Sequence, residues 1–166
     1  PTGFAITEFL VPRSYADRYN LISCALGHHI YESRWLRNRE YLQNNVHTWF
    51  RGNNGGMMEK LRKFSSWTAD ALYNSYLVNG DKAFLTGMFP DLEEEYRLWE
   101  GDHRRADGLF WQTDVADGME ESISGGRRVK NARPTINSYM YGNAAALEKI
   151  AALSGIREKE EYYGKK

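Results

Sequence analysis

Hydrophobic positions recur along most of the chain at the spacing of amphipathic helices. Leu42, Val46, Trp49 and Phe50 follow one another at i, i+4, i+7 and i+8, so a helix over residues 39–50 would place all four on one face. The same periodicity predicts further helices at about residues 19–30, 66–78, 81–87, from 91, from 134 and at 157–163. After a short extended candidate at residues 4–10, no alternation typical of a strand recurs.

Residues typical of helix ends divide the chain at the same places. Asn79-Gly80 is a stop signal, and Asp91 with Glu94 has the form of a capping box. Pro134 suits the first turn of a long helix. Short connections between successive helices indicate an all-α protein built of helical hairpins. The helices show no fixed repeat period, so a tetratricopeptide or ankyrin array is not supported.

Composition narrows the class of partner. The chain has 166 residues, the size of one domain, with 22 basic and 22 acidic residues. A net charge of zero gives no electrostatic case for nucleic acid or an anionic membrane, and no apolar run reaches the roughly 20 residues that span a bilayer. The chain begins at Pro1 without a methionine or a signal-like segment, which indicates a piece of a longer protein.

The segment 106–122 carries the strongest chemical signal. Its residues 111–121 gather four carboxylates, a tryptophan and a glutamine: Asp114, Asp117, Glu120, Glu121, Trp111 and Gln112. Proton transfer to a sugar leaving group needs one carboxyl group that stays protonated near neutral pH, and an apolar wall or a like charge favours that form. A solvated acidic loop is the alternative. The aromatic residues and glycines within the cluster favour a site.

Two other segments pair aromatic with charged side chains. The first is residues 31–35, with Tyr31, Glu32, Arg34 and Trp35, which could bracket a sugar. The second is residues 65–70, where Trp67 and Asp70 share one helical face. A structural ion pair beside core aromatics and a capped helix start are the respective alternatives.

A metal or cofactor is not expected. Adjacent helical residues such as His28 and His29 point about 100° apart and cannot easily bind one ion. His47 and His103 are remote in sequence, and Cys24 is a lone cysteine, so zinc is disfavoured.

Several of these segments, in order, resemble the (α/α)6-barrel glycosidases, in particular the trehalase and family 63 α-glucosidase group with its bacterial members. Residues 31–33 (Tyr-Glu-Ser) are similar to an early Tyr/Trp-Asp-Ser motif of that group. Residues 65–67 and 76–81 resemble a serine-rich helix start and its Tyr-Leu-x-x-Gly-Asp stop. Residues 116–120 (Ala-Asp-Gly-Met-Glu) can be laid on the acid motif Glu-Ser-Gly-Trp/Met-Asp, and the helix after them is also similar.

The resemblance implies that Glu120 is the general acid. Glu replaces Asp at both catalytic-type positions and Asp117 replaces Ser, so Glu121 and Asp117 stay open as alternative acids. The residues expected to bind substrate are Tyr31, Glu32, Arg34, Trp35, Trp67, Asp70, Trp111, Gln112, Asp114 and Asn137.

The length sets the expected domain organisation. A complete six-hairpin barrel has twelve helices and this chain supplies about six, so residues 1–166 are expected to be the N-terminal half of an incomplete toroid. The resemblance implies an inverting glycoside hydrolase whose general base lies outside the chain, so that the fragment alone is inactive. Its partners would be a carbohydrate and the rest of the catalytic domain, with a periplasmic or secreted bacterial location. The rivals are a non-catalytic helical-hairpin binding module and a lyase-type or carbohydrate-binding toroid that uses Tyr and Arg.

Overall fold

The computed structural model describes residues 5–120, 123 and 126–166, and the regular structure in this part of the chain is almost entirely helical. Its elements are, in order, η1 (Ser23–Ala25), α1 (Leu26–Ser33), α2 (Glu40–Arg51), α3 (Thr68–Asn79), α4 (Lys82–Gly87), α5 (Phe89–His103), β1 (Trp111–Gln112), η2 (Val115–Asp117), β2 (Asn131–Ala132), α6 (Pro134–Ser154) and α7 (Arg157–Tyr163).

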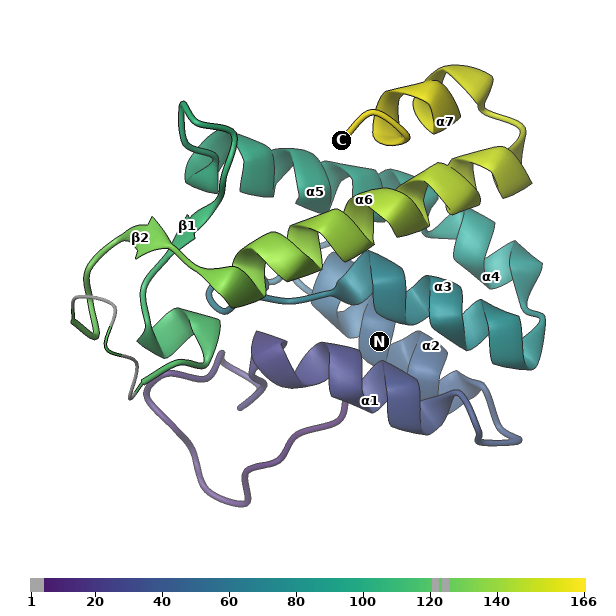
Figure 1. Cartoon of the computed structure of the whole chain (residues 1–166). Helices are drawn as coiled ribbons and strands as arrows, with labels where there is room; N and C mark the ends of the chain where they lie inside the picture. The colour runs from purple at the N-terminus through teal and green to yellow at the C-terminus, as the bar shows by residue number, and fades with distance from the viewer. Residues whose placement is uncertain (1–4, 121–122, 124–125) are drawn as a thin grey trace.

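The helices form hairpins in two layers. Helices α1, α3 and α6 lie next to one another and run in the same direction, with α3 in contact with both neighbours (Figure 1). Helices α2 and α5 run back behind them, and α7 returns over α6. Parallel inner helices joined through returning outer helices are the arrangement of an (α/α) toroid, so the prediction of an all-α fold of helical hairpins forming part of such a toroid is confirmed.

The core lies between the two layers. The predicted stripe of α2 is buried there in full, since Leu42, Val46, Trp49 and Phe50 are each at most 4% exposed. Helix α6 contributes a second stripe made of Ile136, Met140, Leu147 and Ile150. Each large apolar side chain buried in this way stabilises the fold by about 1.5–3 kcal/mol.

The first helix begins later than predicted and runs further. Asp17 Oδ1 accepts the N–H groups of Tyr19 and Leu21 at 2.8 and 2.9 Å, and Asn20 adopts a φ of 61°. This local turn competes with the helix, so α1 starts only at Leu26 after the turn η1. In consequence residues 31–33, predicted to follow the helix, form its last turn.

The fifth helix begins earlier than the capping box at Asp91 predicted. It starts at Phe89 and carries Pro90 in its first turn, where the missing N–H of proline is tolerated. The Asp91 carboxylate instead pairs with Arg51 at 2.5 Å. A tertiary ion pair has replaced the local cap.

A short ribbon is a further departure from the predicted elements. Strands β1 and β2 pair antiparallel, with Trp111 opposite Ala132 and Gln112 opposite Asn131. Two-residue strands are too short to produce an alternating pattern, so no periodicity could predict them. The ribbon closes the loop 113–130 at its base.

Among the helices within the described residues, none is both long and apolar enough to cross a membrane.

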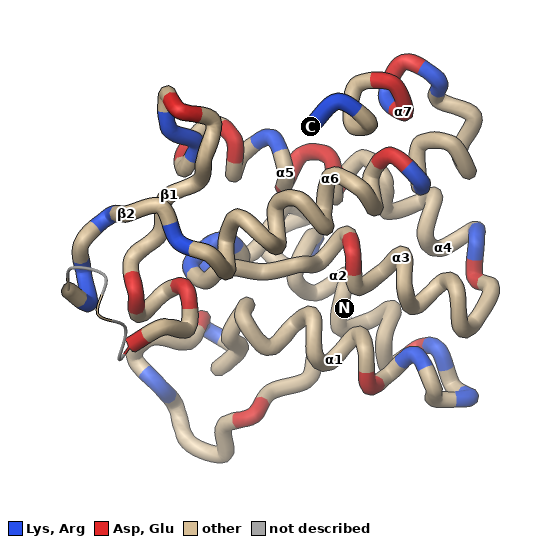
Figure 2. The backbone as a smooth tube through the Cα atoms, in the orientation of Figure 1, with Lys and Arg blue, Asp and Glu red and all other residues tan. Residues whose placement is uncertain are grey.

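Charged residues lie mainly in the loops and on the outer helices, and the inner helices carry few (Figure 2). Helix α3 has one charged residue, Asp70, and α6 has two, Glu148 and Lys149, both near its C-terminal end. Asp70, the one charged residue of α3, is therefore an exception in this inner layer that needs a partner or a role.

Candidate active site

The loop that carries the acidic cluster is fastened to the N-terminal ends of α3 and α6. The N–H of Ser65, just before α3, donates to the carbonyl of Ala116 at 2.9 Å. The Ser65 hydroxyl donates to Asp117 at 2.5 Å. The N–H groups of Thr135 and Ile136, in the first turn of α6, donate to the same carboxylate at 3.2 and 2.8 Å.

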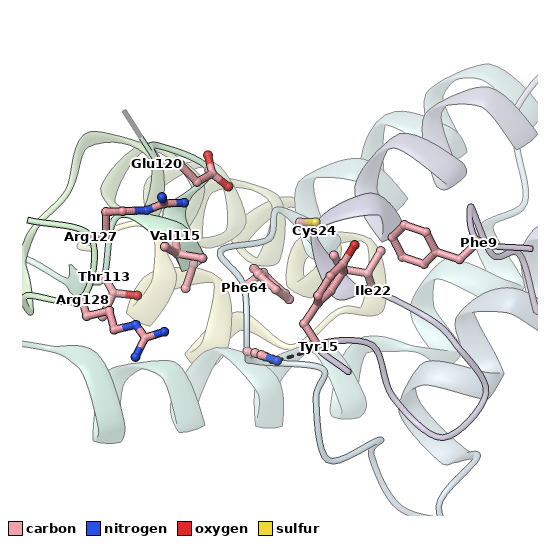
Figure 3. Close-up of a pocket in the computed structure, with 13 residues that line it drawn as sticks. Phe9, Tyr15, Ile22, Cys24, Phe64, Thr113, Val115, Glu120, Arg127 and Arg128 are labelled. Carbon is pink, nitrogen blue, oxygen red and sulfur yellow. Dashed lines mark hydrogen bonds between the residues drawn. The ribbon is translucent and has the colours of Figure 1, made fainter. Parts of the chain in front are cut away.

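A cavity of about 860 Å³ opens beside this loop (Figure 3). Its walls come from the N-terminal segment, from the chain before α3 and from the acidic loop. Three aromatic side chains, three cationic side chains and one carboxylate line it: Phe9, Tyr15, Phe64, Lys63, Arg127, Arg128 and Glu120. Figure 3 shows Glu120 and Arg127 on one side of the cavity and Cys24 and Tyr15 on the other.

Local backbone geometry brings Glu120 to this cavity. The turn η2 ends at Gly118, whose φ of 70° lies in the left-handed region that glycine adopts without strain. The N–H of Met119 then donates to the carbonyl of Asp114 at 2.8 Å. The next residue is Glu120, which is exposed and lines the cavity, so its carboxyl group is accessible to a ligand there.

Asp117, the second candidate acid, has a different environment. It is 3% exposed, and both of its oxygens accept hydrogen bonds from protein groups. Burial raises the pKa of Asp117, while the hydrogen bonds from Ser65 and Thr135 oppose that rise. These contacts are those of a group that joins segments of the chain. Glu121, the third candidate, lies outside the described residues.

The residues predicted to bind substrate from the base of the loop are built into its framework. Asp114 and Arg133 form an ion pair with side chains that are 0% and 1% exposed. Asn137 accepts the N–H of Phe110 at 2.9 Å and donates to its carbonyl at 2.8 Å. Gln112 is buried in strand β1. These side chains hold the loop in place and do not line the cavity.

Trp111 does not line the cavity with Glu120. Its ring stacks on His103 at 4.1 Å between centroids and 18° between planes, and Lys130 Nζ lies 4.0 Å from the ring centroid. The ring therefore packs against the end of α5 and forms no part of the cavity wall.

A second polar cluster lies between α1 and α3. The Tyr31 hydroxyl donates to Asp70 at 3.4 Å, and Asn74 donates to the other oxygen of Asp70 at 3.2 Å. The Arg34 guanidinium lies 4.2 Å from the centroid of the Tyr31 ring and 5.1 Å from that of Trp35. Burial raises the pKa of Asp70, and burial together with the Asp70 charge raises the pKa of Tyr31.

Two of the predicted residues in segment 31–35 are directed to solvent. Glu32 is exposed and Trp35 is 68% exposed, and neither lines the cavity. Glu32 and Glu120 therefore do not face one common cavity in this structure.

Trp67 packs between two other aromatic rings. Its ring packs edge-on against His28 and at a 43° tilt against Tyr139, each 4.7 Å away between centroids. A Cβ at position 27 would come within 2.4 Å of the Trp67 ring, so Gly27 is what allows this approach.

Tyr139 and His28 were missed as site candidates. Tyr139 had one signal, its place in the segment 137–141 that resembles the glycosidase helix. His28 was considered as a metal ligand and disfavoured in that role. Over the ranges 5–120, 123 and 126–166, no group of three or more His, Cys, Asp or Glu side chains could hold a metal ion.

Comparison with known proteins identifies the family. The model of the mannosylglycerate hydrolase MGH1-like glycoside hydrolase domain matches residues 18–166. The chain belongs to this MGH1-like glycoside hydrolase family. No curated protein matches it. Membership in the MGH1-like family confirms the resemblance to six-hairpin glycosidases that the motifs indicated.

A solved structure described as a sialidase is also similar to this MGH1-like domain. It shares 62% sequence identity and superposes with a TM-score of 0.95 over 99% of the chain. The chain spans 15% of the length of that protein.

Proposed function

We propose that this chain supplies the acid-bearing part of an (α/α)6 glycoside hydrolase, with Glu120 as the general acid. The observation that carries the proposal is the position of Glu120, an accessible carboxyl group at a large cavity beside the N-terminal ends of two inner helices. The family assignment adds that the reaction class is glycoside hydrolysis. Glu120 would donate a proton to the glycosidic oxygen as the bond breaks.

The second carboxylate is proposed to come from outside residues 1–166. Inverting glycosidases place their two carboxyl groups roughly 6.5–9.5 Å apart so that a water fits on the opposite sugar face. Asp114 and Asp117 are both committed to internal contacts, which leaves neither available as that base. The inner helices also expose apolar side chains, Leu77 and Tyr141 among them at 60% and 73%, which further helices of a toroid would cover.

The charges in the cavity favour a substrate with an acidic group. Lys63, Arg127 and Arg128 line the cavity with Glu120, whereas the chain as a whole is neutral. Arginine is well suited to bind carboxylates by paired hydrogen bonds. Mannosylglycerate, the compound in the family's description, carries a carboxylate. The proposed substrate is thus a glycoside with an anionic leaving group or sugar.

The other residues predicted to bind substrate are proposed to have different roles according to their position. Trp67 and Tyr139 pack against each other, and Tyr139 lies within electrostatic range of Cys24, which lines the cavity. Both rings are proposed to stack on a sugar ring. Tyr31, Arg34 and Asp70 form the polar cluster beyond them and are proposed to bind sugar hydroxyl groups. The framework residues of the loop would act on substrate through the loop alone.

The decisive test is Glu120→Gln in the full-length protein. Hydrolysis of mannosylglycerate and of a sialoside should fall by about 10²–10⁴-fold, the usual loss for a general acid. Turnover of the matching 2,4-dinitrophenyl glycoside should change little, because that leaving group departs without a proton. Glu121→Gln is the control and should be mild. Proton NMR of the first-formed sugar should show inversion of the anomeric centre.

The rival function is a non-catalytic binding module in the same family fold. It predicts that Glu120→Gln weakens saccharide binding without any leaving-group dependence. If Glu120→Gln keeps full activity on the natural glycoside and Glu121→Gln loses it, then Glu121 is the general acid.

A further inference from the structure

The start of α6 has no cap of its own. Its N-cap residue, Arg133, makes no side-chain cap bond, and the helix opens with Pro134. The next N–H groups of a first turn have no partner within the helix and need an acceptor from elsewhere. Asp117 supplies it, with Oδ2 at 3.2 Å from the Thr135 nitrogen and Oδ1 at 2.8 Å from the Ile136 nitrogen.

The same carboxylate also holds the chain that leads into α3. Asp117 Oδ1 accepts the Ser65 hydroxyl at 2.5 Å, and the backbone of Ser65 donates to Ala116 at 2.9 Å. Asp117 is 3% exposed and Ser65 is equally buried. One buried carboxylate therefore joins three segments, and the positive end of the α6 dipole favours its negative charge.

Glu120 stands three residues beyond this junction. Between them, Gly118 reverses the chain and Met119 is fixed by its bond to the Asp114 carbonyl. The position of Glu120 thus depends on two anchors, the Asp117 carboxylate and the Met119 amide. Neither anchor lines the cavity, so neither competes with a ligand.

We infer that Asp117 is a positioning residue, which sets the place of Glu120 by tying the acidic loop to the first turn of α6 and to Ser65. The inference rests on the proposed role of Glu120 as the acid. A carboxylate is required because both oxygens accept. Asparagine keeps one acceptor oxygen and presents an NH2 group to a backbone N–H, so one of the two α6 bonds is lost.

The test compares Asp117→Asn with Glu120→Gln in the full-length protein. The substrates are mannosylglycerate or the sialoside, whichever is turned over, and its 2,4-dinitrophenyl counterpart. Asp117→Asn should lower kcat on the natural glycoside by about 10²-fold, the cost of a displacement near 1 Å, with little change in KM. The loss on the dinitrophenyl glycoside should be small. A merely structural role would lower both rates equally.

Asp107→Asn is the matched control. Asp107 also accepts a backbone N–H, that of Leu109 at 3.1 Å, but it lies in the exposed turn between α5 and β1, and the variant should keep wild-type rates. Ser65→Ala, which removes one bond and leaves α6 capped, should show the same selective loss in smaller measure. It decides the matter if Asp117→Asn does not fold.

Hydrogen–deuterium exchange gives a readout that needs no turnover. Asp117→Asn should speed exchange in peptides covering residues 114–120 and 135–137, and Asp107→Asn should not. Unchanged exchange there, or equal losses on both substrates, overturns the positioning role. Wild-type activity of Glu120→Gln on the natural glycoside would instead overturn the proposed function. In that case the exchange experiment alone tests whether Asp117 anchors the loop.

Discussion

The buried ion pair between Asp114 and Arg133 should dominate the stability of the acidic loop. Both side chains are at most 1% exposed, and Arg133 also donates to the carbonyls of Gln112 and Val129 at 3.3 and 3.1 Å. Arg133→Met retains much of the volume and removes the charge. The Asp114 carboxylate is then left buried without its cationic partner.

Removing one member of a buried pair costs about 3–5 kcal/mol, because the remaining charge stays desolvated. For a domain of this size each kcal/mol corresponds to roughly 2–4 °C in the melting temperature, so Arg133→Met should melt roughly 6–20 °C lower. Denaturant unfolding followed by tryptophan fluorescence measures the free energy directly. Replacing both partners, as Arg133→Met with Asp114→Leu, should recover part of the loss because no charge is then stranded.

The comparison is the surface pair of Arg105 with Asp107, whose atoms lie 2.9 Å apart and whose side chains are 41% and 46% exposed. Arg105→Met should cost less than about 1 kcal/mol, since exposed pairs contribute little. Two results would refute the reasoning. One is a loss below about 1 kcal/mol for Arg133→Met as well. The other is a double variant, Arg133→Met with Asp114→Leu, that is about 3–5 kcal/mol less stable than Arg133→Met alone.

Two further predictions concern the inner layer and its support. Gly27→Ala should destabilise the fold by about 1–3 kcal/mol, as overpacking does, because the new Cβ would lie 2.4 Å from the Trp67 ring; Gly87→Ala, which meets no atom within 4 Å, is the control in the same melt. Burial raises the pKa of Glu95 from 4.5 to about 7, so the folded state binds a proton that the unfolded state releases, and stability should fall as pH rises from about 4.5 to 7, by up to about 1.4 kcal/mol per unit. Glu95→Gln should flatten that slope in unfolding titrations, and an unchanged slope would contradict the assignment.

Helix existence could be predicted from the sequence because it depends on local periodicity. The α2 stripe and the start of α6 at Pro134 follow from residues a few positions apart. The start of α1 could not be predicted in this way, because Asp17 and Asn20 form a competing turn. The apolar residues that follow this turn have the pattern of a helix that begins earlier. Asp91 shows the same limit, since its carboxylate prefers Arg51, a residue 40 positions away.

The candidate site could likewise be predicted only where local sequence is sufficient. The acidic cluster was recognisable from its composition, but composition could not separate the three roles of its carboxylates. Asp114 pairs with Arg133 and Asp117 caps α6, both through partners 18 or more positions away, while Glu120 faces the cavity. Trp111 was placed with the acids because it is near them in sequence, and its contacts are with His103.

Helices α3 and α6 show why the acidic loop can be both irregular and well placed. Neither helix has a side-chain cap from its own N-cap residue. Helix α3 receives its acceptor from Asn143 of α6, which takes the Asp70 N–H at 3.2 Å and donates to the Ser66 carbonyl at 3.1 Å. Helix α6 in turn receives its acceptor from Asp117 in the loop. The start of α3 is therefore completed only when α6 is in place, and the start of α6 only when the loop is in place. The loop, α3 and α6 thus gain order together, and the position of Glu120 depends on that shared junction.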